Sequence, residues 1–180
     1  MAKKWWNVLV FAMLVSALPS LWASVPLGTG ASFDAGFSPS RGALDVVLKG
    51  IRAAKKQILV AGYMFTSKPI AAALVEAHRR GVQVFVVVDA KENQGKYSAA
   101  TFLANADVPV RLNANYKIFH HKFMVLDGTS LQLGSFNYTA AAEKNAENAL
   151  LLSQVPDLAA AYASEWKRLW DEAVVLPKAY

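Results

Sequence analysis

The chain has 180 residues, a length that fits one domain with a substantial hydrophobic core. It contains no cysteine, which excludes disulfides, cysteine-held zinc and a cysteine nucleophile. The formal net charge of +6 suits a polyanionic partner, but a mild excess of this kind does not define a function by itself.

The first 23 residues have the pattern of an export leader. Lys3 and Lys4 form a positive end, an apolar run follows from Val8 to Leu18, and Ala23 offers a small residue for cleavage. We therefore predict a signal peptide and a periplasmic or secreted protein. The alternative is a retained anchor in the inner membrane that faces outward, because the apolar stretch is about 18 residues, near the lower limit for a span.

After a flexible joint at residues 24–31, periodicity and turn residues predict alternating strands and helices. In the first half we expect a strand at 31–37, a helix at 41–56 capped by Ser40, a strand at 57–65, a helix from Ser67 to Arg80 and a strand at 82–89. A polar loop at 91–95, a helix at 97–105 and a strand at 108–112 follow. The last third is predicted to hold a hairpin that begins with a strand at 119–126 and turns at Asp127-Gly128, a helical piece at 139–144, a strand at 148–152 and a helix at 156–173. This order predicts one α/β domain over residues 32–180, with a mixed, mostly parallel sheet flanked by helices.

The predicted hairpin carries an unusual set of polar side chains. The residues are His120-His121-Lys122, Asp127 and Gly134-Ser135-Phe136-Asn137, which read as H-x-K, four residues, D, six residues, G-S-x-N. His120 and Lys122 are two positions apart and share one face of a strand, while His121 points to the other face. Ser135 and Asn137 share a face of the next strand by the same rule. We expect these four side chains to converge on one anionic group.

This pattern resembles the HKD signature of the phospholipase D superfamily, with six positions at the family spacing. The segment Tyr63 to Thr66, the run Val82 to Asp89 and the pair Glu147-Asn148 also resemble segments of its small bacterial members. The resemblance covers roughly residues 32 to 175 and is strongest to small, single-motif bacterial endonucleases that act in EDTA. It implies a phosphodiesterase with a phospholipase D-like fold that needs no metal or other cofactor.

Phosphodiester cleavage needs two imidazoles at this kind of site. A neutral imidazole can attack phosphorus and form a covalent phosphohistidine, and a protonated one can donate to the leaving oxygen. One ring cannot readily do both, because attack and protonation occur on opposite sides of an in-line displacement. The motif occurs once, so the resemblance implies a symmetric homodimer in which two His120 side chains face each other.

Supporting roles follow for the other residues of the pattern. Lys122, Ser135 and Asn137 are expected to bind the phosphate oxygens. Asp127 begins an Asp-Gly turn, so we interpret it as bracing the site, with a direct catalytic role as the alternative. Glu147 is a candidate to orient an imidazole through its far nitrogen, and Glu143 is the competing candidate for this role.

The motif identifies the bond and leaves the substrate open. The first hypothesis is a non-specific endonuclease acting on single- and double-stranded DNA, and also on RNA, with backbone phosphates contacted by the cations Lys91, Lys96, Arg111 and Lys117. The second is a phospholipid phosphodiesterase, of phospholipase D or cardiolipin hydrolase type, held at a membrane by a retained leader. The third is a silent nucleic-acid-binding module, which the intact His120, Lys122 and Asn137 set argues against.

Overall fold

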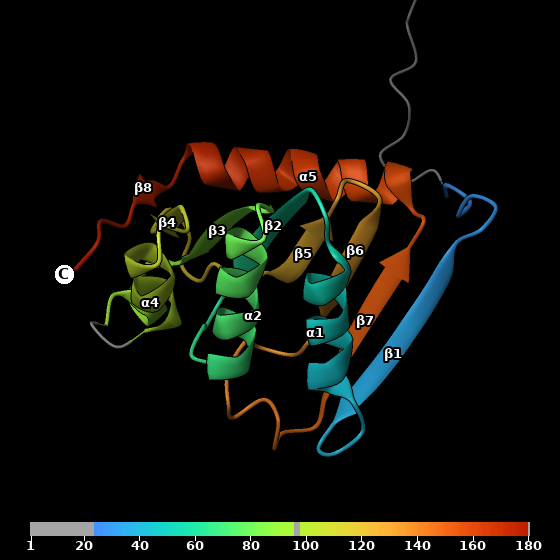
Figure 1. The fold of residues 1–180 in the computed structure, drawn as a ribbon, viewed down its shortest axis with the longest axis horizontal. Helices are drawn as coiled ribbons and strands as arrows, with labels where there is room; N and C mark the ends of the chain where they lie inside the picture. The colour runs from blue at the N-terminus through green and yellow to red at the C-terminus, as the bar shows by residue number, and fades with distance from the viewer. Residues whose placement is uncertain (1–23, 96–97, 180) are drawn as a thin grey trace, which may run out of the picture.

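The computed structural model describes residues 24–95 and 98–179, which form an eight-stranded sheet with helices on both faces (Figure 1). The strands are β1 Ser32–Ser38, β2 Gln57–Gly62, β3 Gln83–Asp89, β4 Val110–Asn113, β5 Lys122–Leu126, β6 Ser130–Gly134, β7 Glu147–Ser153 and β8 Val174–Val175. The helices are α1 Ala43–Ala53, α2 Lys68–Arg79, α3 Ala90–Asn93, α4 Ala99–Asn105 and α5 Pro156–Asp171. The predicted signal peptide lies outside the described residues and stays a prediction.

The sheet order is β1-β7-β6-β5-β2-β3-β4-β8. The predicted α/β architecture with a mixed sheet is confirmed. The expectation of mostly parallel strands is wrong, because only the β2–β3 and β3–β4 pairs are parallel and the remaining neighbours are antiparallel. Helical crossovers join β2, β3 and β4. In contrast, a short turn joins β5 to β6, and β7 pairs antiparallel with the first strand, β1.

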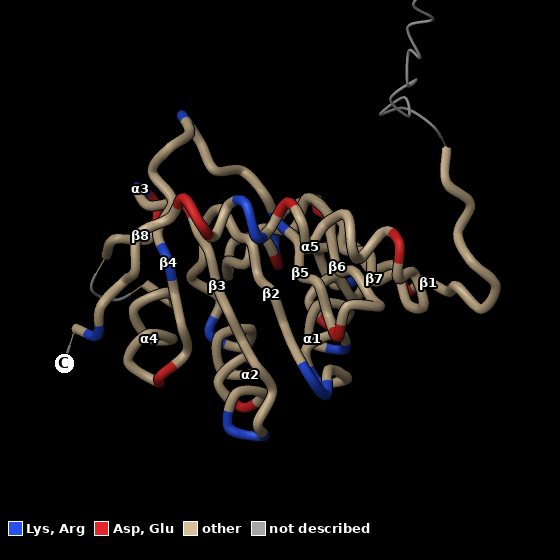
Figure 2. The backbone as a smooth tube through the Cα atoms, turned by 90° about the horizontal axis from the view of Figure 1, so that it is seen from above, with Lys and Arg blue, Asp and Glu red and all other residues tan. Residues whose placement is uncertain are grey.

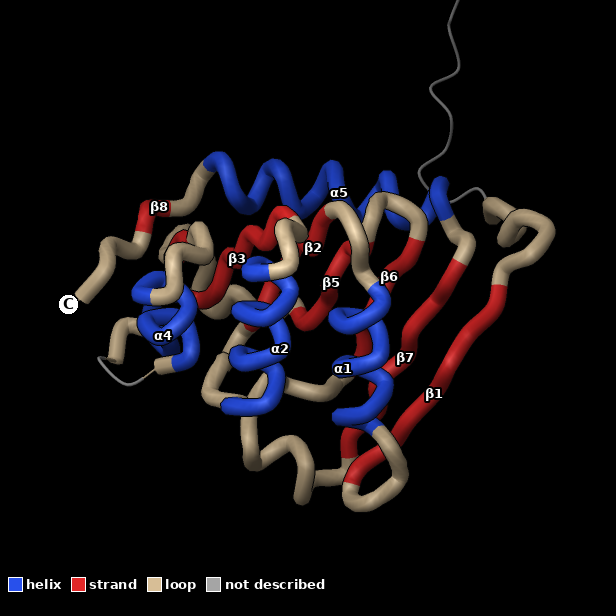
Figure 3. Tube along the Cα trace, in the orientation of Figure 1, coloured by secondary structure: helices blue, strands red, loops and turns tan. Residues whose placement is uncertain are grey.

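Two hydrophobic cores cover the two faces of the sheet. Helices α1, α2 and α4 pack on one face, and α5 crosses the strands on the other (Figures 1 and 3). Val47 and Ile51 of α1 are fully buried in the first core, and Trp166 and Leu169 of α5 are buried in the second. The Trp166 indole Nε1 also donates to the carbonyl oxygen of Val60 at 2.9 Å, which fixes α5 across the middle of the sheet.

Several predicted boundaries move in the structure. The helix predicted from Arg41 begins at Ala43, because Ser40 and Gly42 adopt left-handed backbone conformations and Gly42 takes the N-cap position. The loop predicted at 91–95 contains α3, whose first turn is capped by the Asp89 side chain. Residues 139–144 form turns instead of the expected helical piece, and the two-residue β8 was not predicted. None of the described helices is long and apolar enough to cross a membrane.

The polar residues of interest gather at one end of the sheet. The register pairs the last residue of β2, Gly62, with the first residue of β5, Lys122, and the last residue of β6, Gly134, with Ala149 near the start of β7. The loop between β4 and β5, which carries His120, projects beyond the sheet at this end (Figure 2). The opposite end holds the β5–β6 turn at residues 127–129 and the start of α5.

Candidate active site

His120 and Lys122 lie together, as the spacing predicts. The Lys122 Nζ donates to the carbonyl oxygen of His120 at 2.9 Å. His120 is exposed and Lys122 is half-buried, so an imidazole and an ammonium group open to solvent side by side. The strand predicted from Phe119 begins only at Lys122, because β2 ends opposite it at Gly62 and offers no further ladder partner.

The Asp89 side chain accepts a hydrogen bond from the chain before β5, where strand pairing with β2 has ended. Asp89, 5% exposed at the end of β3, accepts a hydrogen bond from the backbone N–H of Phe119 at 2.9 Å. Its other carboxylate oxygen accepts from the Glu92 N–H and caps α3. The residue immediately before His120 is therefore held by a buried carboxylate, which fixes the path of the loop that carries His120.

Ser135 lies just after β6 and is engaged within the protein. Its hydroxyl donates to the Glu147 carboxylate at 2.6 Å and accepts from the Asn148 backbone and side-chain nitrogens at 3.1 and 3.2 Å. Gly134 allows this close approach, because a Cβ at that position would lie 2.3 Å from the Asn148 carbonyl oxygen. The prediction that Ser135 and Asn137 belong to a strand is wrong: β6 ends at Gly134, where Phe136 turns its N–H to Asn148.

Asn137 is half-buried at the same end of the sheet. The next residue, Tyr138, accepts hydrogen bonds at its carbonyl from the N–H groups of Thr66 and Ser67, so the segment is fastened to the chain that follows β2. The Asn137 Oδ1 is buried and has no hydrogen-bond partner among the described residues. This oxygen can only accept a hydrogen bond, so the predicted binding of phosphate by Asn137 would depend on the donor of the amide, its Nδ2.

Glu147 contacts Ser135 rather than His120 within the chain. Its second oxygen accepts from Asn145 at 3.3 Å, and its charge acts on Lys122. Glu143, the competing candidate, lines a hollow beside Phe136 and the start of α1. The role of either glutamate in orienting an imidazole stays a prediction, and Glu147 is the one whose charge acts on Lys122.

The charge on Lys122 is tuned by its surroundings. Burial lowers the pKa of its ammonium group, and the Glu147 carboxylate partly raises it again. Replacing Glu147 by glutamine removes the raising effect, so Lys122 should lose its proton at lower pH than in the wild type. We expect the alkaline limb of the kcat/KM profile to move toward neutrality in Glu147→Gln. An unchanged alkaline limb would contradict this coupling between the two charges.

His121 faces away from the site, as its position in the sequence predicts. Its ring packs edge-to-face against Phe119 and Phe123, with centroids 5.7 and 5.4 Å apart, and its Nε2 is 3.9 Å from the Glu165 carboxylate of α5. Burial lowers the pKa of His121. This histidine belongs to the α5 face and cannot join His120 as a second imidazole from the same chain.

Asp127 lies at the opposite end of β5 from the site. Its carboxylate accepts from the backbone N–H groups of Lys55, Lys56 and Gln57 at 2.9, 2.7 and 2.9 Å. These bonds fasten the β5–β6 turn to the start of β2. The position supports the bracing role and leaves no direct contact with His120, so the alternative of Asp127 as a catalytic group does not fit the geometry.

Replacing Asp127 by alanine is expected to lower the free energy of unfolding by about 2 kcal/mol, because three N–H groups lose a charged acceptor. The melting temperature should fall by about 4–8 °C. Burial raises the pKa of this carboxyl, but the three donors together lower it more. The stabilisation is thus present at neutral pH and lost as the pH falls through that lowered pKa. Thermal unfolding at several pH values tests this, and lost activity in the folded variant would contradict a purely bracing role.

The predicted phosphate-binding cations differ in availability. Lys91 and Lys117 are exposed, and Lys96 lies outside the described residues. Arg111 is used internally, since it donates to the Trp170 carbonyl at 2.8 Å and stacks over the Trp170 ring at 4.5 Å. Among the described residues, no three His, Cys, Asp or Glu side chains form a group that could hold a metal ion.

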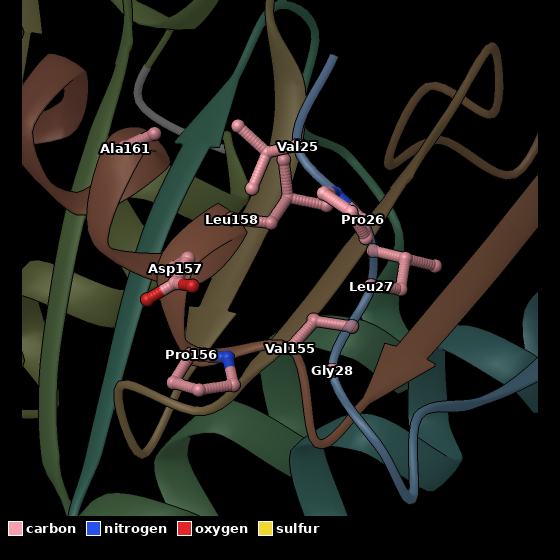
Figure 4. Close-up of a pocket in the computed structure, with 9 residues that line it drawn as sticks. All are labelled: Val25, Pro26, Leu27, Gly28, Val155, Pro156, Asp157, Leu158 and Ala161. Atoms are coloured by element: carbon pink, nitrogen blue, oxygen red, sulfur yellow. The ribbon is translucent and has the colours of Figure 1, made fainter.

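An apolar hollow of about 190 Å³ lies between the N-terminal segment and the start of α5 (Figure 4). Val25, Leu158 and the backbone at Gly28 line it, and Asp157 is its charged residue. Val155, also in its lining, donates to the carbonyl of Thr129, which places the hollow at the end of the sheet opposite His120. A carboxylate in an apolar setting does not suit a phosphodiester, so this hollow is separate from the site.

Comparison with known proteins agrees with the motif. A family model described as cardiolipin synthase, PLD-like domain, matches residues 47–170. Phospholipase D of Rickettsia bellii is 34% identical over 131 residues, which cover 72% of this chain and 65% of that protein. The mitochondrial cardiolipin hydrolase of Xenopus laevis is 34% identical over 119 residues, which cover 66% of this chain and 57% of that protein. The matched part thus spans less than two thirds of these relatives.

Solved structures share the fold. The crystal structure of Nuc, a phospholipase D family member from Salmonella typhimurium, has a TM-score of 0.80 at 36% identity and is similar over 82% of this chain and 99% of that one. NucT from Helicobacter pylori has a TM-score of 0.72 at 24% identity, over 81% and 99% of the two chains. The chain belongs to the phospholipase D superfamily of phosphodiesterases. The family resemblance read from the HKD motif is confirmed.

Sequence reasoning missed three residues that the structure brings to the site. Tyr63 contacts His120 and Lys122, and the buried side chains of Asp89 and Asn93 hold the segments that carry them. The sequence held a signal for two of them, because Asp89 ends a buried strand and Tyr63 directly follows another. Asn93 was hidden in a segment predicted as a loop, where asparagine is common.

Proposed function

We propose that the protein is a metal-independent endonuclease that cleaves DNA, and also RNA, through a covalent phosphohistidine on His120. The proposal is carried by the contact between the Lys122 ammonium and the backbone of His120 on an exposed end of the sheet. An open site of this kind can admit a long polymer. The similarity to Nuc, at 36% identity over 82% of this chain and 99% of that one, adds support.

The chemistry follows from the residue types. The imidazole of His120 attacks phosphorus while Lys122 and Asn137 bind non-bridging oxygens and stabilise the charge that develops on them. A second imidazole donates a proton to the leaving oxygen, and later activates the water that hydrolyses the phosphohistidine. We propose that it is the His120 of a second copy, in a symmetric homodimer that shares one site. We also propose export to the periplasm or beyond, through the leader at residues 1–23.

A lipid phosphodiesterase is the second candidate. The similarity to the phospholipase D of Rickettsia bellii and to the mitochondrial cardiolipin hydrolase of Xenopus laevis favours it. Ile118, two residues before His120, is 50% exposed, and Tyr116 is 39% exposed, so the loop that carries His120 has apolar surface that could meet acyl chains. This reading goes with a leader that is retained as an anchor.

A direct comparison of substrates tests the proposal. The full chain and a chain that starts at residue 24 are incubated in excess EDTA with supercoiled plasmid and, separately, with cardiolipin vesicles. Nicking of the plasmid by both forms, with DNA binding that weakens as salt rises, is the expected result. Activity on vesicles alone, lost when residues 1–23 are removed, would favour the lipid phosphodiesterase instead.

A further inference from the structure

Tyr63, the first residue after β2, contacts both His120 and Lys122 through its ring. Its centroid lies 4.8 Å from that of the His120 ring, with the planes inclined at 56°. The Lys122 Nζ lies 5.4 Å from the same centroid. Because Lys122 also donates to the His120 carbonyl, the three residues form a closed set of contacts.

Two buried side chains fix the two halves of this contact. Asn93, which is fully buried, donates to the Tyr63 carbonyl at 2.6 Å and accepts from the Phe65 N–H at 3.0 Å. It also donates to the carbonyl of Asp89 at 2.8 Å, and the Asp89 carboxylate holds the Phe119 N–H. The end of β3 and the short helix α3 therefore hold the backbone of Tyr63 and the backbone next to His120 in fixed positions relative to each other.

An aromatic ring is a suitable partner for a lysine that must bind phosphate. The negative face of the ring attracts an ammonium group but, unlike a carboxylate in direct contact, does not neutralise its charge. Burial and then the nearby Glu92 raise the pKa of the Tyr63 hydroxyl, so the ring is uncharged at neutral pH. The ring can therefore hold the Lys122 ammonium and leave its positive charge available to a phosphodiester.

We propose that Tyr63 is a positioning residue of the active site, whose ring face holds the Lys122 ammonium and the His120 imidazole in the arrangement needed for attack. The proposal rests on the proposed function for the roles of His120 and Lys122. Tyr63 acts through these two side chains and has no part in bond making. Its ring is the acting group, and its hydroxyl is dispensable.

The test compares Tyr63→Phe and Tyr63→Leu in the full chain. Hydrolysis of bis(4-nitrophenyl) phosphate in EDTA gives kcat and KM, and NMR of ¹³C-labelled lysine follows the titration of Lys122. Tyr162→Leu is the matched control, because Tyr162 is a half-buried tyrosine that packs on Phe123 on the α5 side of the sheet. Tyr63→Met replaces the leucine variant if the latter does not fold.

We expect Tyr63→Phe and Tyr162→Leu to keep kcat within about threefold of the wild type. Tyr63→Leu should lower kcat by about 30-fold with little change in KM, as small misplacements of reacting groups do. The groups that face Lys122 are His120, Tyr63 and Glu147, and loss of the ring should move the Lys122 titration to lower pH.

Two results would overturn the proposal. In one, Tyr63→Leu matches Tyr63→Phe in both kcat and the Lys122 titration. In the other, Tyr63→Phe is as impaired as Tyr63→Leu, so that the hydroxyl is the acting group. Absence of wild-type hydrolysis would instead count against the proposed function, and the Lys122 titration would still decide whether the ring holds the ammonium.

Discussion

Replacing His120 by asparagine should abolish phosphodiester cleavage, with kcat on supercoiled plasmid lowered by at least about 10⁴-fold in EDTA. Asparagine can neither attack phosphorus nor carry the leaving-group proton. The side chain is exposed, so the fold should be unaffected and the melting temperature should stay within about 2 °C of the wild type. His121→Asn is the neighbouring control, because His121 faces α5 and should leave cleavage close to the wild-type level.

The same variant measures whether the site is shared. If each active site needs two His120 side chains, a dimer of one wild-type and one His120→Asn chain is inactive. After subunit exchange at equal amounts, only about one quarter of the dimers are wild type, so activity per total chain should fall to about one quarter. A fall to about one half would mean that each chain works alone, and the homodimer proposal would be abandoned.

Replacing Lys122 by methionine is expected to lower kcat/KM by about 10³-fold, since a fixed cation at the developing phosphorane charge is removed while the length of the side chain is kept. Methionine can still pack on the Tyr63 ring, so the segment around His120 should keep its path. Plasmid nicking and circular dichroism on the same preparation measure the two effects.

Lys117→Met provides the matched control for charge alone. Lys117 lies on the loop between β4 and β5 that precedes Lys122 and is exposed, so its loss should weaken DNA binding modestly and reduce its salt dependence, with kcat nearly unchanged. Equal losses of kcat in the two variants would mean that Lys122 contributes only general attraction for a polyanion, and its placement at the reacting phosphate would be wrong.

Local patterns in the sequence predicted the parts of the site that depend on neighbouring residues. Strand alternation placed His120 and Lys122 on one side and His121 on the other, although the strand proper starts only at Lys122. The direction of a side chain follows from the extended backbone, so it alternates even where no neighbouring strand is hydrogen-bonded. The Asp127-Gly128 turn was predicted for the same reason, because the turn chemistry resides in those residues.

The arrangement of the sheet was less accessible from local patterns. The predicted strands are present, but their pairings were expected to be mostly parallel. In the structure the β1–β7, β7–β6 and β6–β5 pairs are antiparallel. Periodicity reports which faces of a strand are buried and contains no information about its neighbour or its direction. A buried parallel strand and a buried antiparallel strand therefore look alike in the sequence.

The sequence by itself determined the family and the alternation of elements, and it selected His120, Lys122 and Asn137 as candidate site residues. Only the tertiary structure decided that Tyr63 contacts His120 and Lys122, that Glu147 binds Ser135, and that Asp89 and Asn93 hold the loops in place. The reason is that these contacts join the ends of strands that are distant in the chain. Beyond the ends of β2 and β6, backbone groups no longer find partners in a neighbouring strand, and side chains bind them instead. The register of the whole sheet decides which side chain lies close enough to do this.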